Sequence, residues 1–219
     1  MKKLVIFDLD GTLLNTIADL AHSTNYALNK LGYPTHEIEK YNFMVGNGIN
    51  KLFERALPEG EKTEENVLRV RNEFVPHYDI HNADDSRPYP GIPELLSYLQ
   101  SAGIQIAVAS NKYQAATEKL VAHYFPGIFE VIRGNLPGTP VKPDPGVARG
   151  ILEKLNARPE ETLMVGDSDV DILTGHNAHL PAMGALWGFR GRAELTAAGA
   201  DALAAVPEDI WAYIQERNK

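Results

Sequence analysis

The 219-residue sequence contains no cysteine, which excludes disulfide bridges, thiolate nucleophiles and cysteine-based zinc sites. It also lacks any apolar run near the roughly 18 consecutive residues that a membrane-spanning helix requires. The apolar run close to Met1 is too short for a signal peptide. We therefore expect a cytoplasmic protein that has no membrane partner.

Positive charge is in the minority. The chain has 21 lysine and arginine residues against 29 aspartate and glutamate residues, a net charge of −8 with histidine neutral. An acidic surface repels nucleic-acid backbones at long range, so we expect no nucleic-acid partner. The seven histidines form no H-E-x-x-H pattern, and no G-x-x-x-x-G-K-[ST] phosphate loop is present. We therefore interpret the histidines as surface or packing residues, and a nucleotide-binding module is disfavoured.

Short apolar runs rich in Val, Ile, Leu and Ala alternate with segments of helical periodicity. The predicted strands span residues 3–7, 104–109, 129–133, 162–165 and 182–186, and clear helical patterns span 92–99 and 147–155. Continuous apolar runs of this length are typical of strands that are buried on both faces of a parallel sheet. The sequence therefore predicts an α/β fold with a doubly wound, Rossmann-like parallel sheet.

One interval, residues 15–85, shows no strand pattern. Its periodicity predicts helices over 17–31, 47–57 and 63–78, and a segment rich in turn formers follows at 84–91. We expect a catalytic core of residues 1–14 and 86–219, with a small all-helical cap domain of residues 15–85 inserted after the first strand.

Four short motifs carry polar side chains at or near the ends of predicted strands. They are Asp8-Leu9-Asp10-Gly11-Thr12, Ser110-Asn111-Lys112, Val141-Lys142-Pro143 and Gly166-Asp167-Ser168-Asp169-Val170-Asp171. Ligands of an open parallel sheet bind outside the carboxyl ends of its strands, so we expect these motifs to meet in one crevice. Each motif alone has an ordinary interpretation as a helix cap, a capping box or a surface residue. Their joint occurrence indicates a functional site.

The acidic residues of these motifs would repel one another in a shared crevice. Asp8, Asp10 and Asp167 cannot all stay ionised without a counter-charge, and Lys142 alone supplies too little. A hard divalent cation supplies the rest, and Mg²⁺ suits oxygen ligands that leave room for water and phosphate. Such a site binds a phosphoryl group, which an exposed aspartate can attack to form an aspartyl-phosphate.

The four motifs resemble those of haloacid dehalogenase superfamily phosphatases, and the resemblance covers essentially the whole chain. It implies that Asp8 is the nucleophile and that Asp10 is the general acid and then the general base. It also implies that Ser110 and Lys142 hold phosphate oxygens. The Asp8 carboxylate, the Asp10 main-chain carbonyl and Asp167 would bind Mg²⁺.

The resemblance implies supporting roles for three further residues. Thr12 and Asn111 would complete the phosphate cradle together with neighbouring backbone amides. Asp171 would lie behind the metal ligands and orient Lys142 or a metal-bound water.

The predicted cap contains Val45-Gly46-Asn47-Gly48-Ile49, which is similar to the cap loop of phosphoglycolate phosphatases, and residues 185–191 resemble part of their core. The glycines leave backbone amides exposed at a helix start, where an anion is favoured. The resemblance implies a Mg²⁺-dependent phosphatase that acts on a small phosphorylated metabolite, 2-phosphoglycolate. Gly46, Asn47 and Gly48 would then bind the substrate carboxylate, with Lys112 or Arg55.

Other interpretations stay open at this point. A broad sugar-phosphate phosphatase, a pyrophosphatase or a mutase resembling β-phosphoglucomutase would share the same core. A hydrolytic dehalogenase has no need of Asp10 or Mg²⁺, and a non-catalytic phosphate-binding module would not need both Asp8 and Asp10. The sequence is compatible with a monomer or a homodimer. Two positions depart from the family pattern: Ser168 replaces the usual threonine, and His179 stands at a glycine-like turn position.

Overall fold

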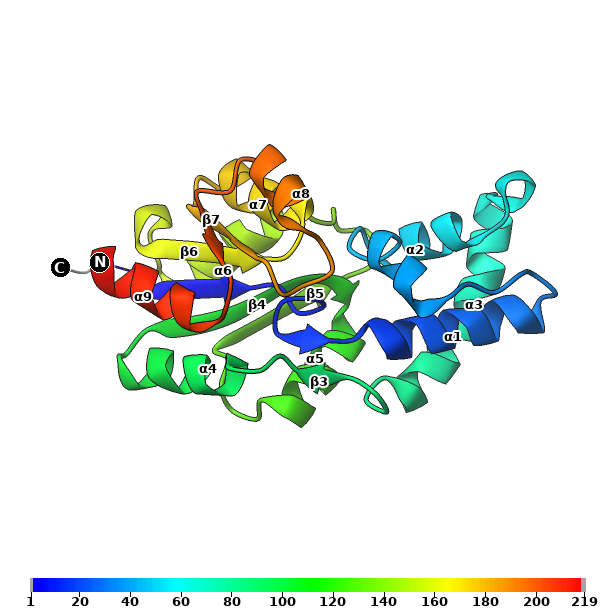
Figure 1. Ribbon diagram of the computed structural model, residues 1–219, viewed down its shortest axis with the longest axis horizontal. Coiled ribbons are helices and arrows are strands. Elements are labelled where there is room, and N and C mark those ends of the chain that lie inside the picture. The colour runs from blue at the N-terminus through cyan, green and yellow to red at the C-terminus, as the bar shows by residue number, and fades with distance from the viewer. Residues whose placement is uncertain (1, 218–219) are drawn as a thin grey trace.

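The computed structural model describes residues 2–217 and contains a six-stranded parallel sheet with the strand order β5-β4-β1-β6-β7-β8 (Figure 1). The strands are β1 (Leu4–Phe7), β4 (Gln105–Tyr113), β5 (Val131–Asn135), β6 (Thr162–Gly166), β7 (Ala182–Ala185) and β8 (Ala202–Ala204). Every neighbouring pair in this sheet is parallel. The predicted fold class, a doubly wound parallel sheet, is confirmed.

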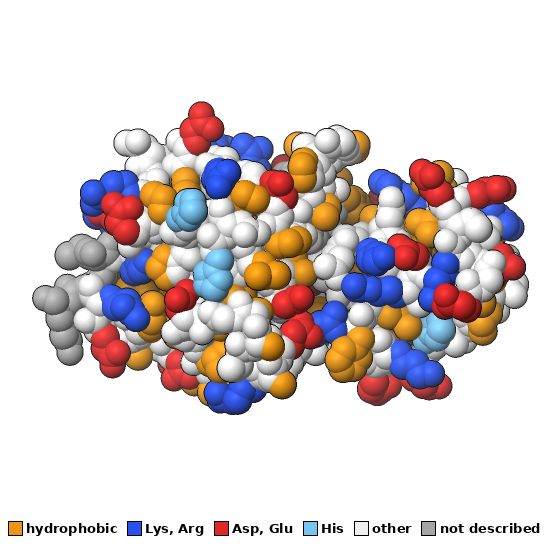
Figure 2. Space-filling model, turned by 90° about the horizontal axis from the view of Figure 1, so that it is seen from above, with side chains coloured by type: hydrophobic (Ala, Val, Ile, Leu, Met, Phe, Trp, Pro, Cys, Tyr) orange, Lys and Arg blue, Asp and Glu red, His pale blue; other side chains and the backbone are white. Residues whose placement is uncertain are grey.

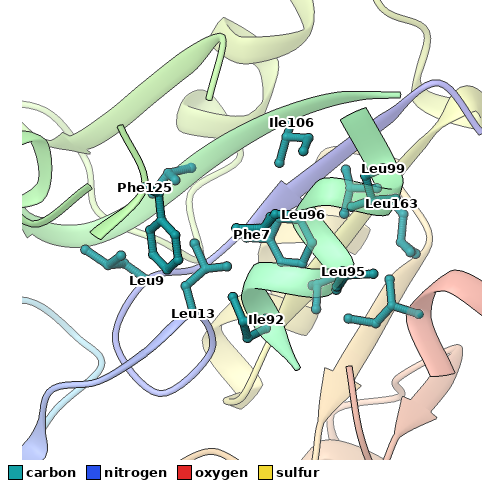
Figure 3. Close-up of a cluster of buried hydrophobic side chains, with 14 of the residues drawn as sticks. Phe7, Leu9, Leu13, Ile92, Leu95, Leu96, Leu99, Ile106, Phe125 and Leu163 are labelled. Carbon is teal, nitrogen blue, oxygen red and sulfur yellow. The ribbon is translucent and has the colours of Figure 1, made fainter. Parts of the chain in front are cut away.

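Helices cover both faces of the sheet, because the apolar side chains of β1 point alternately to one face and to the other. Val5 and Phe7 point into one apolar cluster, whereas Leu4 and Ile6 point into the other. The first cluster is covered by α4 (Ile92–Ser101), α5 (Gln114–Tyr124) and α9 (Glu208–Arg217), and the second by α6 (Gly146–Leu155), α7 (Asp169–Asn177) and α8 (Arg192–Ala197). Figure 3 shows Phe7 packed among Leu95, Leu96 and Leu99 of α4. All four residues of β1 are buried, which explains their uninterrupted apolar sequence.

A second group of helices lies beyond one end of the sheet (Figure 1). It contains α1 (Ile17–Lys30), α2 (Ile49–Ala56) and α3 (Glu64–His81), with short 3₁₀ segments η1 (Ile38–Phe43) and η2 (Glu59–Glu61). These helices share an apolar cluster of their own, in which Phe53, Phe74 and Tyr78 are fully buried. We propose that the chain divides into the two domains that the sequence predicts. These are a core of residues 1–14 and 86–219 and a cap of residues 15–85.

The two chain crossings between these parts lie side by side. β2 (Leu14–Asn15) pairs antiparallel with β3 (Arg87–Pro88). The buried carboxylate of Asp19, in the first turn of α1, accepts hydrogen bonds from the backbone N–H groups of Asp85 and Ser86 at 2.9 and 2.8 Å. The start of the first cap helix therefore holds the segment by which the chain returns to the core.

The structure corrects several boundaries. The strand predicted over 129–133 begins two residues later, at Val131, and α3 continues through Pro76 to His81. β4 does not end at Ala109 but runs to Tyr113, with an irregular register between Ala109 and Tyr113. The motif Ser110-Asn111-Lys112 therefore belongs to the end of β4 itself, because Tyr113 still pairs with Asn135 of β5.

The mixed surface charge and the turn at His179 agree with what the sequence predicts. On the face shown in Figure 2, acidic and basic side chains are interspersed. No helix among residues 2–217 has the length and apolar character to cross a membrane. His179 adopts φ 63°, the left-handed region that favours glycine, as its position in the turn after α7 predicts.

Candidate active site

The carboxyl ends of β1, β4 and β6 meet beneath the cap helices. A cavity there is lined by Asp8 and Asp10 after β1, by Ser110 of β4 and by Asp167 after β6. Its opposite wall comes from the cap, from Gly46 and Gly48 of the loop before α2 and from apolar side chains. Those apolar residues are Leu20, Val45, Ile49, Leu52, Phe74 and Tyr78. Three of the four sequence motifs thus line one cavity, as predicted.

Three buried carboxylates form the base of this site. Asp8, Asp167 and Asp171 can each offer an oxygen within 4.8 Å of the others. Lys142 lies among them, with its Nζ 2.8 Å from Oδ1 of Asp8 and 2.6 Å from Oδ1 of Asp171. The remaining motif, Val141-Lys142-Pro143, therefore reaches the site through Lys142, from below the cavity. Of the two partners expected for Asp171, Lys142 or a metal-bound water, the structure shows the contact with Lys142.

One ammonium group does not balance three carboxylates. Burial raises the pKa of Asp8 to about 7, although Lys142 acts against this rise. Burial also raises the pKa of Asp167, and the charges of Asp171 and Asp8 raise it further. The same two neighbours raise the pKa of Lys142 despite its burial. The site therefore carries excess negative charge that a divalent cation with oxygen ligands would neutralise, and these residues fit Mg²⁺.

Asp10 lies outside this carboxylate cluster. Its Oδ1 accepts a hydrogen bond of 2.7 Å from the Thr16 hydroxyl, and its Oδ2 lies 3.1 Å from Nζ of Lys112. The Asp10 side chain is therefore free of the cluster of Asp8, Asp167 and Asp171, which suits the expected use of its main-chain carbonyl toward the metal.

Two glycines allow the loops to close around Asp167. Gly11 adopts φ +89°, and a Cβ there would lie 2.4 Å from Oδ2 of Asp167. A Cβ at Gly188 would lie 2.2 Å from the Asp167 Cβ. The N–H of Phe189 then donates to Oδ2 of Asp167 at 2.7 Å. The loop after β7 is thereby packed directly on the predicted metal ligand.

The structure corrects the predicted substrate contacts of Asn111 and Thr12. Both N–H donors of the Asn111 amide are engaged, by the carbonyls of Gly46 and Lys142 at 3.0 and 3.1 Å, and its Oδ1 accepts from the Lys142 N–H. The Thr12 hydroxyl is fully buried and donates to Oδ1 of Asp167 at 3.3 Å. Neither side chain has a donor left for a phosphate oxygen, so both hold the site together instead.

The cap residues also differ from expectation. Arg55 donates to the Met44 carbonyl at 2.9 Å and to Oδ1 of Asn47 at 2.7 Å, and neither Arg55 nor Asn47 lines the cavity. These two side chains therefore stabilise the cap loop rather than face a substrate. Gly46 and Gly48 do line the cavity, and their contact with a substrate stays a prediction.

Lys112 is a buried residue. Its Nζ contacts Oδ2 of Asp10 at 3.1 Å and the Tyr78 hydroxyl at 2.9 Å. Lys112 is therefore not a solvated surface charge, and its place in the cavity wall keeps it a candidate for substrate contact.

Sequence reasoning did not assign a role to Tyr78 or Arg190, which both line the cavity. Tyr78 lies within a helix that was predicted, but its apolar periodicity indicates only burial. Arg190 lies in the segment that resembles the phosphoglycolate phosphatase core, and this resemblance was the one signal that pointed to it.

This arrangement defines a class of protein. A doubly wound sheet that presents Asp8 beside a buried lysine and a cluster of buried carboxylates, under a helical lid, is an enzyme site suited to the transfer of a phosphoryl group to water. The chain belongs to the haloacid dehalogenase-like hydrolase family, whose sequence profile matches residues 5–185.

Individual relatives agree with this membership. The chain is 33% identical to a phosphoglycolate phosphatase of Psychrobacter arcticus over 86% of this chain and 85% of that protein. It is 35% identical to one of Agrobacterium fabrum over 86% and 82% of the two chains. A crystal structure from Lactobacillus delbrueckii subsp. bulgaricus, provisionally described as a phosphoglycolate phosphatase, matches with a TM-score of 0.90 and 31% identity over 96% and 97%. The predicted class, a phosphatase of this family, is confirmed.

Proposed function

We propose that the protein is a Mg²⁺-dependent phosphatase that hydrolyses 2-phosphoglycolate to glycolate and phosphate through an aspartyl-phosphate. The observation that carries the proposal is the cavity in which Asp8, paired with the buried Lys142 beneath it, and Asp167 lie opposite the glycine loop of the cap. The names of the relatives from Psychrobacter arcticus and Agrobacterium fabrum support the same substrate.

Asp8 is the proposed nucleophile. An Asp8 carboxylate oxygen attacks phosphorus, the bond from phosphorus to the ester oxygen breaks, and an acyl phosphate forms on Asp8. Water then attacks phosphorus, the acyl phosphate is cleaved, and phosphate leaves while Asp8 is restored. Lys142 holds the carboxylate that attacks, because its Nζ lies 2.8 Å from Oδ1 of Asp8.

Asp10 is the proposed acid and base. It donates a proton to the departing glycolate oxygen and later takes a proton from the attacking water. Thr16 and Lys112 hold its two carboxyl oxygens beside the cavity. We propose that the Asp8 carboxylate, the Asp10 carbonyl and Asp167 hold Mg²⁺. When bound there, Mg²⁺ supplies positive charge that offsets the phosphoryl oxygens.

The cap side of the cavity suits a second, small anionic group. α2 begins without a side-chain cap after Gly48, whose φ is +85°, so its first backbone N–H groups stay available to an anion. The cavity volume is ≈ 50 Å³, and one water occupies about 10–15 Å³ by this measure. A small phosphate ester with a short carboxylate chain suits this wall, because the wall offers backbone N–H groups to a second anion.

Phosphate release with Mg²⁺ tests the proposal. We expect kcat/KM for 2-phosphoglycolate to exceed the values for glucose 6-phosphate, AMP and pyrophosphate by at least about tenfold. Comparable rates on all four would contradict the substrate and favour a broad phosphatase. Accumulation of an isomerised sugar phosphate without phosphate release would favour the mutase. The cytoplasmic location and the monomeric or homodimeric state remain predictions.

Magnesium binding has an expected effect on stability. Because the three carboxylates repel one another, 10 mM Mg²⁺ should stabilise the fold by about 2 kcal/mol, which corresponds to a rise in melting temperature of roughly 4–8 °C. In Asp167→Asn one negative charge is gone, so the metal-free variant should melt above the metal-free wild type and respond little to Mg²⁺.

Thermal unfolding in EDTA and in Mg²⁺ measures both effects. Asp169→Asn is the matched control, because Asp169 lies two residues further on and is exposed. It should keep the full response to Mg²⁺. A wild type whose melting temperature ignores Mg²⁺ would show that the carboxylate cluster does not hold the ion.

A further inference from the structure

Arg190 lies where the core, the cap and the cavity meet. It follows Phe189 in the loop between β7 and α8, and it lines the cavity. The loop is held firmly: the Trp187 indole N–H donates to the Thr12 carbonyl at 3.0 Å, and the Phe189 N–H donates to Asp167. The backbone that carries Arg190 is therefore fixed on the residues of the reaction centre.

The guanidinium group of Arg190 reaches across to the cap. Its Nη2 donates to the Val45 carbonyl at 3.1 Å, and its Cζ lies 5.1 Å from the centre of the Phe43 ring. Only 9% of the side chain is exposed. A carbonyl and an aromatic face are partners without net charge, so neither of them balances the positive charge of Arg190.

The other cations at the site differ from Arg190 in this respect. Lys142 contacts Asp8 and Asp171, and Lys112 contacts Asp10, each within 3.1 Å. The one carboxylate paired with Arg190, that of Glu194, lies 3.5 Å from its Nε and is 35% exposed. Among the cavity-lining cations of residues 2–217, Arg190 thus has the weakest anionic partner.

A second guanidinium group increases the positive potential here. Burial lowers the pKa of Arg55, and the charge of Arg190 lowers it further. Arg55 does not itself line the cavity, but an anion bound beside Arg190 would reduce the repulsion between the two arginines. The fork of Arg190 donors matches a carboxylate in a way that a single ammonium group cannot.

We infer that Arg190 is a specificity-determining residue that binds the carboxylate of the substrate while it holds the Val45 carbonyl of the cap. The inference rests on the proposed function, because it assigns the receptor for the group that distinguishes 2-phosphoglycolate from a simple alkyl phosphate. One guanidinium group has five N–H donors, so it can serve both acceptors at once. Substrate binding and cap closure would then share one side chain of the core.

Two substrates of equal chain length separate this role from a structural one. We would measure kcat/KM with 2-phosphoglycolate and with ethyl phosphate, which lacks the carboxylate, in the wild type and in Arg190→Gln. The ratio of the two values should fall at least about 30-fold in Arg190→Gln, because the substrate carboxylate loses its buried partner. Arg190→Lys keeps the charge but not the fork and should give an intermediate ratio. Arg192→Gln, an exposed arginine at the start of α8, should keep the wild-type ratio.

The possible results distinguish a failure of the role of Arg190 from a failure of the proposed substrate. An equal loss on both substrates in Arg190→Gln would show that Arg190 only fastens the cap, and would contradict the inference. A wild-type preference that survives in Arg190→Gln would also contradict it while leaving the proposed substrate in place. A wild type without any preference for 2-phosphoglycolate would contradict both proposals. If melting curves show that Arg190→Gln does not fold, an unchanged ratio in Arg190→Lys overturns the assignment.

Discussion

Replacing Asp8 with asparagine is expected to lower kcat at least about 10⁴-fold, because a carboxamide cannot attack phosphorus and form an acyl phosphate. The change is nearly isosteric, and Oδ1 can still accept the hydrogen bond from Lys142 that Asp8 accepts at 2.8 Å. The variant also removes one of three mutually repelling buried carboxylates. It should therefore fold, and in EDTA it should melt no lower than the wild type.

Two measurements check this expectation. Steady-state phosphate release gives the loss of turnover, and mass spectrometry of acid-quenched enzyme detects the phosphorylated Asp8 peptide in the wild type alone. Asp144→Asn offers the matched control, since Asp144 is exposed in the loop after Lys142 and should tolerate the same change. Wild-type turnover in Asp8→Asn would show that another group is the nucleophile.

The sequence predicts the central sheet well because its strands are buried on both faces. The uninterrupted run Leu4–Phe7 has one interpretation, since each residue faces one of two apolar clusters. β8 has only the small sequence Ala202–Ala204, and this edge strand carries no pattern that distinguishes it from a loop. The pairing of β2 with β3 was not predicted either, because two residues in each strand are too few for a periodic signal.

The sequence also locates the site, since parallel strands end at one edge of the sheet. That geometry is enough to bring Asp8 and Asp167 together from 159 positions apart, with their oxygens within 4.8 Å. It does not determine which partner each polar side chain selects. Asn111 supplies the example: its amide holds the backbone of Lys142 and the cap loop, contacts that span 31 and 65 positions.

Contacts between the cap and the core are the least predictable part. Arg190 and Val45 lie 145 positions apart, and neither belongs to one of the four motifs. Arg55 looks equally suitable in the sequence, yet it turns to the carbonyl of Met44 and to Asn47 within the cap. The choice between these two arginines depends on how the cap sits on the sheet, which local sequence does not encode.

Replacing Lys142 with methionine is expected to cause a large loss of stability. The change leaves the carboxylates of Asp8 and Asp171 without the ammonium group that now lies 2.8 and 2.6 Å away, in a site where both are buried. Removal of one partner from a buried ion pair costs about 3–5 kcal/mol. In EDTA the melting temperature should therefore fall by roughly 6–20 °C, and turnover should be lost as well.

A double variant tests whether uncompensated charge is the cause. Asp171→Asn can keep the hydrogen bonds that Ser168 donates to Oδ2 of Asp171, while it removes one of the two carboxylate charges that Lys142→Met leaves unpaired. Added to Lys142→Met, it should restore about a third or more of the lost stability, so the two changes are not additive. Lys154→Met on the exposed side of α6 should leave the melting temperature within about 1 °C, because exposed lysines contribute little. Additive losses in the double variant would mean that Lys142 stabilises the core through packing of its aliphatic chain, and that the three carboxylates tolerate one another without it.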